Sequence, residues 1–188
     1  MDAIESLITR SSAKTYGETA PTREHLAQVL QAAVRAPDHG RLRPWRFMII
    51  EGNQRRKFGD MLAASALRRV PGLSEGDLQR ERDKAMRAPL IILVACRVVP
   101  GTKVPAIEQI LAAGAATQNI LLALHALGYV ATWKTGEAAY DSEVKRALGF
   151  AADDHIVGLV YTGSGLGATL ATGKAASVQD AMQDFPAG

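Results

Sequence analysis

Apolar residues repeat along the chain with a helical spacing in some segments and as compact runs in others. The clearest helical repeat runs from Thr22 to Ala36, where apolar residues recur at intervals of three and four positions. Thr22 is suited to cap the start of this helix, and Pro37 disfavours helical geometry at the preceding residue. The same spacing predicts helices over Asp2–Thr9 and Gln54–Arg69, and the longest helix is expected over Pro105–Leu127. Asp77–Arg87 is expected to be a highly charged helix with a solvated face, and Asp141–Leu148 a short helix between its Asp141 cap and Gly149.

Short apolar or aromatic runs between turn-forming residues predict strands. Leu90–Val99 is an almost continuous apolar run, which is typical of a central strand buried on both faces. Further strands are expected over Trp45–Glu51, Tyr129–Trp133 and His155–Thr162. Two helices precede the first strand, so a strict alternation of strands and helices is not present. With no internal repeat or linker, residues 1–188 are expected to form a single domain.

The helix expected over Pro105–Leu127 is rich in alanine and leucine and is nearly uncharged after Glu108. A helix that is apolar on most sides must be buried on most sides. In a domain of this size a second subunit is one way to cover it, so the sequence predicts an oligomer.

The amino-acid composition excludes a disordered chain and argues against several other classes of protein. Of the 188 residues 47% are hydrophobic and 22% charged, which excludes a disordered chain. The 22 basic and 19 acidic residues give a net charge of +3, which is weak support for a nucleic-acid binder. No apolar run reaches the length of about 18 residues that a membrane span needs, and Met1–Arg10 does not resemble a signal peptide. A cytoplasmic protein without membrane association is expected.

Several familiar catalytic patterns are missing from the sequence. The four histidines form no zinc-binding motif, and the single cysteine, Cys96, lies in a predicted core strand. No nucleophile elbow is present, so neither a metal site nor a catalytic side chain is predicted. The run Gly163–Ala168 fits a dinucleotide-binding fingerprint, but too little chain follows to complete that fold, and a flexible loop is the favoured reading.

Three segments combine cations with hydroxyl or aromatic groups. Arg10-Ser-Ser-Ala-Lys14 offers two cations and two hydroxyls to an anionic ligand, although a solvated loop is the favoured interpretation of this segment taken alone. Arg35-Ala-Pro-Asp-His39 places His39 in a loop where side chains often meet ligands. Trp133-Lys-Thr-Gly136 ends a predicted strand, and an ordinary strand terminus is an equally good reading.

In their order along the chain, these segments resemble the nitroreductase family of flavoproteins, in particular its small bacterial YdjA-like branch. The resemblance covers roughly Met1 to Gly165. It also rests on Arg43-Pro-Trp-Arg-Phe47, on Arg87-Ala-Pro89, on Gly128 before Trp133, and on the strand that ends at Gly163.

The resemblance implies an α+β nitroreductase-like fold, with a mostly antiparallel central sheet flanked by helices, assembled as an intertwined homodimer with FMN at the interface. Family positions that hold FMN match Arg10, Ser11, Ser12, Lys14, Arg35, His39, Trp133, Lys134 and Thr135. Arg35 and His39 match positions that reach the flavin of the other subunit. The family's C-terminal region crosses onto the partner, which here corresponds to Ala168–Gly188 with Lys174 as its cation.

The implied activity is an NAD(P)H-dependent FMN oxidoreductase, with NADH or NADPH as reductant. It would reduce nitroaromatics, quinones or similar small acceptors by ping-pong hydride transfer, because reductant and acceptor use the same flavin face. One alternative is a flavin-binding module without turnover. Another is a nucleic-acid regulator that uses Arg41, Arg43, Arg46, Arg55, Arg56 and Lys57.

Overall fold

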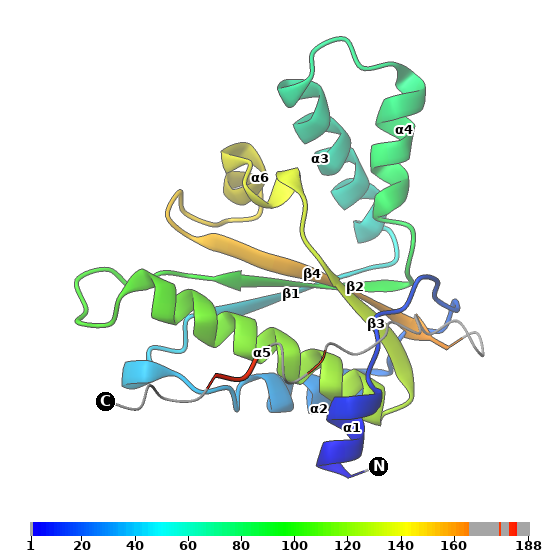
Figure 1. The fold of residues 1–188 in the computed structure, drawn as a ribbon. Helices are drawn as coiled ribbons and strands as arrows, with labels where there is room; N and C mark the ends of the chain where they lie inside the picture. The colour runs from blue at the N-terminus through cyan, green and yellow to red at the C-terminus, as the bar shows by residue number, and fades with distance from the viewer. Residues whose placement is uncertain (1, 166–176, 178–180, 184–188) are drawn as a thin grey trace.

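The chain folds around one four-stranded sheet, which a computed structural model describes for residues 2–165, 177 and 181–183 (Figure 1). The sheet consists of β1 (Trp45–Glu51), β2 (Leu90–Cys96), β4 (His155–Ser164) and β3 (Tyr129–Lys134), in that spatial order. All neighbouring strands are antiparallel. The α+β class and the antiparallel sheet are therefore confirmed.

Helices cover both faces of this sheet (Figure 1). On one face lie α2 (Arg23–Ala33) and α5 (Ala106–Ala126), with α1 (Ala3–Thr9) packed against α5. The opposite face carries α3 (Gln54–Arg69), α4 (Glu75–Lys84) and α6 (Ser142–Ala147), and α3 and α4 project from it as a hairpin. Two short 3-10 helices, η1 (His39–Arg41) and η2 (Glu137–Ala139), complete the described elements.

Strand β2 forms the centre of the core, as its apolar sequence predicts. Every residue of β2 is buried. Because side chains alternate across a strand, Ile92 and Val94 pack with α2 and α5, whereas Ile91 and Leu93 pack with α3 and α6. The two faces of the sheet thus carry separate apolar clusters.

Several helices and strands begin or end at other residues than expected. Helix α2 has the expected Thr22 cap but ends at Ala33 rather than Ala36. Helix α4 spans Glu75–Lys84 rather than Asp77–Arg87, because Ser74 and Asp77 form a reciprocal capping box. Strand β2 ends at Cys96 rather than Val99, while the last two strands run on to Lys134 and Ser164.

Helix α5 is less enclosed than its composition predicts. Its sheet side is buried, but Ile107 and Leu111 are 58% and 63% exposed. Among the described residues, α5 is the one helix long and apolar enough to cross a membrane by length and composition alone. Core helices pass the same test, and α5 packs between α2 and the sheet (Figure 1).

Candidate functional site

Two of the three candidate segments lie side by side. Ser12 pairs with Ala131 in a parallel bridge at the free edge of β3. The Ala13 N–H donates to the Ala131 carbonyl at 3.2 Å, and Thr132 Oγ1 donates to the Ala13 carbonyl at 2.5 Å. Residues 10–14 and 133–135 therefore form one continuous surface, which we call the assembled half-site.

Polar groups of the assembled half-site are left without partners. Ser11 Oγ is buried and has no hydrogen-bond partner among the residues that the structure describes. Within the part of the chain that the structure describes, neither Arg10 nor Lys14 forms an ion pair. An unsatisfied buried hydroxyl next to unpaired cations is a suitable environment for an anionic ligand rich in oxygen atoms.

Trp133 is held in place by an irregularity in β4. The register of β2 against β4 shifts between Val94 and Ala95, which leaves Val157 without a partner in β2. Trp133 Nε1 donates to the Val157 carbonyl at 3.2 Å. The indole lies over Gly158, where any Cβ would overlap the ring. The bulge and the glycine thus orient a 37% exposed aromatic side chain.

The next residue along β3 faces the other side of the sheet. Lys134 Nζ lies 5.8 Å from the centre of the Tyr161 ring, within the range of a cation–π contact. Burial raises the pKa of Tyr161 to about 12, so its hydroxyl is neutral at pH 7. Tyr16 stacks beside Tyr161, with ring centres 6.4 Å apart, and completes an aromatic surface.

The remaining predicted residues, Arg35 and His39, form what we call the outward half-site. His39 Nδ1 lies 2.6 Å from Oε2 of Glu108 in the first turn of α5, and the His39 side chain is 66% exposed. Arg35 is exposed and lines an open hollow of about 440 Å³ between α1, α2 and α5.

His39 lies far from the assembled half-site within a single chain, whereas Arg35 shares its hollow with α1, the helix that leads into Arg10. Thr9, directly before Arg10, bonds through Oγ1 to His125 Nε2 at 2.9 Å in the last turn of α5. His39 meets α5 at Glu108, so the two contacts are about 25 Å apart along the helix axis. Among the described residues no hydrogen bond or ion pair links Arg35 or His39 to the assembled half-site.

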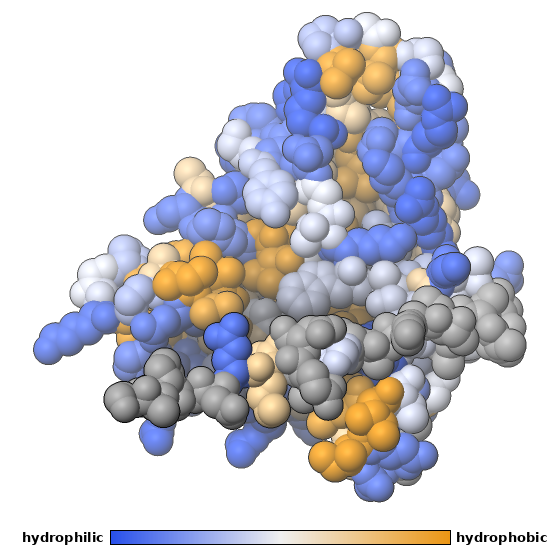
Figure 2. All heavy atoms as spheres, in the orientation of Figure 1, coloured by the Kyte–Doolittle hydropathy of each residue, from blue (hydrophilic) through white to orange (hydrophobic). Residues whose placement is uncertain are grey.

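Exposed apolar side chains lie on α1 and on α5, the two helices that these contacts join. Besides the two exposed residues of α5, α1 exposes Ile4, Leu7 and Ile8 at 67%, 49% and 77%. Figure 2 shows these apolar areas over α1 and near the start of α5. Such exposed patches mark interaction surfaces. Helix α1 directly precedes Arg10, and Ile107 and Leu111 lie on either side of Glu108, the partner of His39, in the sequence.

A charged cavity next to Lys134 was missed by sequence reasoning. It is enclosed by α3, α4, η2 and β4, and its cations are Arg69, Lys84, Arg87 and Lys134. The sequence assigned α4 to a solvated face, and Arg87-Ala-Pro89 was recognised without a role. No periodicity signals this cavity, because its residues come from five separate elements, α3, α4, β3, η2 and β4.

The remaining sequence features have structural roles. Gly163 has no side chain, so the backbone of Gly17 can pack against it, where a Cβ would clash with the Gly17 carbonyl. The Gly17 N–H donates to the Ser164 carbonyl at 2.8 Å. Burial, then the charge of Asp154, raise the pKa of the Cys96 thiol to about 11, so it is a poor nucleophile at pH 7. Gly167, Lys174 and most of the tail 168–188 considered for a partner contact lie outside the described residues, which include only 177 and 181–183 of that tail.

The arginines considered for nucleic-acid binding are partly engaged with the protein backbone. Arg46 Nη1 donates to the carbonyls of Arg43 at 2.9 Å and Trp45 at 2.8 Å. Arg55 Nη1 donates to the Ala88 carbonyl at 2.8 Å. In the described part of the chain, no group of three or more His, Cys, Asp or Glu side chains could hold a metal ion.

Comparison of the sequence with known proteins gives a consistent result. The profile of the nitroreductase family matches residues 7–164. The Escherichia coli K12 protein named "Putative NAD(P)H nitroreductase YdjA" is 38% identical over 164 residues, which cover 87% of this chain and 88% of that protein. A correspondingly named Haemophilus influenzae protein is 36% identical over 167 residues, covering 88% and 90%.

Solved structures share the fold. A nitroreductase-like family protein from Bacillus cereus superposes with a TM-score of 0.84 at 22% identity, over 100% of this chain and 97% of that one. A nitroreductase with bound FMN from Bacteroides fragilis gives a TM-score of 0.74 at 17% identity, over 99% and 100%.

Proposed function

The chain belongs to the nitroreductase family, and from this premise we propose that it is an FMN-dependent oxidoreductase that takes its electrons from NAD(P)H. The observation that carries the proposal is the assembled half-site, where unpaired cations and an unsatisfied hydroxyl lie beside an oriented tryptophan. The named relatives are NAD(P)H nitroreductases, and a related fold holds FMN. We place the protein in the cytoplasm, as a single domain.

The residues of the assembled half-site fit FMN. Arg10, Ser11 and Ser12 would hold its phosphate and ribityl chain, because a guanidinium and two hydroxyls match a phosphate and its neighbouring oxygens. Lys14 would lie at the pyrimidine edge of the flavin, and the segment from Trp133 to Thr135 would contact the rest of the cofactor.

A second copy of the chain would complete each site. Arg35 and His39 of the partner subunit would reach the flavin, which explains why no hydrogen bond or ion pair among the described residues links them to the assembled half-site of their own chain. Pairing of two subunits would also cover Ile107 and Leu111, together with the exposed face of α1. The proposal is therefore a homodimer with two shared sites.

When bound, FMN supplies the redox chemistry by accepting a hydride from NAD(P)H and passing two electrons to an acceptor such as a nitroaromatic or a quinone. The chain contributes binding, access and charge. A lysine ammonium held about 4 Å from a developing negative charge stabilises it by about 4 kcal/mol at an effective dielectric constant of 20, before desolvation. Lys14 and Lys134 are the candidates for that role. No side-chain nucleophile is required.

The visible absorption spectrum of the purified protein tests this function. We expect a bound flavin spectrum, release of FMN on heating, and bleaching when NADH or NADPH is added without oxygen. Re-oxidation by a nitroaromatic or a quinone would then establish turnover. Colourless protein that fails to bind added FMN would refute the proposal, and bound flavin that is not reduced by either nucleotide would favour the non-catalytic flavin-binding alternative.

A further inference from the structure

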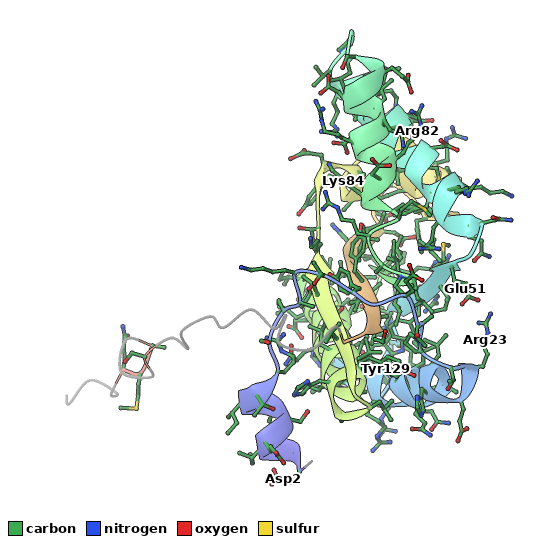
Figure 3. All side chains as sticks on the ribbon, turned by 90° about the vertical axis from the view of Figure 1, so that its right-hand side faces the viewer. Asp2, Arg23, Glu51, Arg82, Lys84 and Tyr129 are labelled. Carbon is green, nitrogen blue, oxygen red and sulfur yellow. The ribbon has the colours of Figure 1, made fainter. Side chains whose placement is uncertain are left out.

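The cavity beside Lys134 has a composition that the proposed function does not explain. It encloses about 260 Å³ between α3, α4, η2 and the end of β3. In Figure 3, Lys84 lies on α4 above the sheet, on the side toward β3 and the segment that follows it. The charged residues that line the cavity are Arg69, Lys84, Arg87, Lys134, Glu81 and Glu137.

Three of its four cations form no ion pair within the described part of the chain, and two of them, Arg69 and Arg87, are not assigned to the flavin. Lys84 Nζ is bonded to both carboxylate oxygens of Glu81, at 2.5 and 2.6 Å, so this pair is neutral. Among the described residues, Arg69, Arg87 and Lys134 form no ion pair. With four cations and two carboxylates in total, the cavity carries an excess of two positive charges.

The floor of the cavity is aromatic and apolar. Tyr161, Leu62 and Leu159 line it below the charged rim. The positive charge of Arg87 acts on both Tyr16 and Tyr161, where it partly offsets the effect of burial on their pKa values, so this guanidinium lies close to the aromatic surface. A lining that combines an aromatic ring and two leucines with cations is complementary to an aromatic ring that bears an acidic substituent.

Size and charge argue against the phosphates of a dinucleotide as the anion bound here. The cavity is below the roughly 300–1,000 Å³ that complete drug-sized ligands occupy, so it holds one substituted ring. The open groove beyond it contains Arg80, Lys84 and Arg87, but also Asp77, Glu81 and Asp83. Three cations against three carboxylates leave that groove neutral, with no excess charge for phosphates.

We propose that this cavity is the acceptor subsite and that it selects small aromatic acceptors carrying a carboxylate, with Arg87 and Arg69 binding the anionic group. The proposal rests on the proposed function, because Lys134 and Thr135 would place the bound ring next to the flavin. It deepens that function by naming a substrate class.

Calorimetric titration of the purified FMN-loaded protein with benzoate and with neutral benzamide tests this subsite without turnover. We expect benzoate to bind more tightly than benzamide. Arg87→Gln is expected to weaken benzoate binding by about tenfold or more, the loss typical of one charge-assisted hydrogen bond, while benzamide binding changes less than about twofold. Arg69→Gln should shift binding in the same direction.

Arg56→Gln is the matched control, because Arg56 is exposed on α3, lines none of the cavities described above and forms no ion pair among the described residues. Equal affinity for benzoate and benzamide would overturn the proposal, as would an equal effect of the control variant. A selective loss of NADPH rather than NADH binding in Arg87→Gln would overturn it too, and would assign the cations to the reductant. Protein without flavin would contradict the proposed function, whereas the benzoate titration would still report on the cavity.

Discussion

The two halves of the candidate site differ in how far one chain completes them. The assembled half-site is fixed by a backbone bridge, a buried threonine bond and a tryptophan seated on a glycine. The outward half-site consists of exposed side chains at the surface, and only His39 has a side-chain partner, on α5. One chain therefore builds one binding surface by itself, while its other candidate residues stay exposed. This difference is what a site shared by two subunits requires.

The largest expected effect comes from separating the two half-sites. Leu111→Glu places a charge on the exposed apolar side of α5, where pairing of two subunits would bury it. We expect monomers that have the wild-type circular dichroism spectrum but retain no flavin, measured by light scattering and absorbance at the flavin maximum. Val70→Glu, at a 53% exposed position beyond α3, is the matched control and should remain dimeric and yellow.

The next effect tests the rigidity of the assembled half-site. Gly158→Ala would drive a methyl group into the Trp133 indole, so we expect a loss of about 1–3 kcal/mol in the free energy of unfolding. Urea denaturation measures this loss. Gly76→Ala, in the first turn of α4 with no close neighbour, should be neutral or slightly stabilising. Equal effects at both positions would show that Gly158 is not required for close packing.

A third effect concerns the unpaired cation at the start of the assembled half-site. Arg10→Gln removes one charge-assisted contact to the proposed phosphate, so the Kd for FMN should rise by about tenfold to a hundredfold. Fluorescence quenching of added FMN measures this Kd. Riboflavin, which lacks the phosphate, should bind equally well to the wild type and to the variant. An unchanged Kd for FMN would place the phosphate elsewhere.

The smallest expected effect concerns Asp141, the residue that caps the start of α6. Burial alone would raise the pKa of Asp141, but the nearby Ser65 hydroxyl, a bond from Arg68 and two N–H groups in the first turn of α6 lower it to about 2. A carboxyl with a depressed pKa stabilises the fold above its unfolded pKa near 4, and this contribution is lost as the pH falls toward 2. Asp141→Asn should cost about 1 kcal/mol at pH 7, and its stability should fall less than that of the wild type between pH 4 and pH 2.

Most helices and strands could be predicted from the sequence, because turns and hydrophobic periodicity depend on residues that are close together in the chain. The bounds of β1 and α3 follow from turn residues and periodicity, and β2 was recognised as central from its unbroken apolar run. The ends of α2 and α4 were less predictable, because competing turns and a capping box act over only a few residues.

The candidate site was predictable only in part, for the same reason. Cationic and hydroxyl residues at Arg10–Lys14 stand out in the sequence, but their pairing with β3 is a long-range contact. The bulge at Val157 and the cavity at Arg87 have no local signal, since each is created by elements distant in the chain.

A mixed dimer tests most directly whether the two half-sites of different chains form one site. One chain would carry Arg10→Ala with Lys14→Ala, and the other Arg35→Ala with His39→Ala, each with a separate affinity tag. Each variant alone should bind little FMN, because every site contains one damaged half. In the mixed dimer one site combines both intact halves, so we predict one FMN per dimer. If the mixed dimer binds no more FMN than the two variant homodimers, the shared site is contradicted.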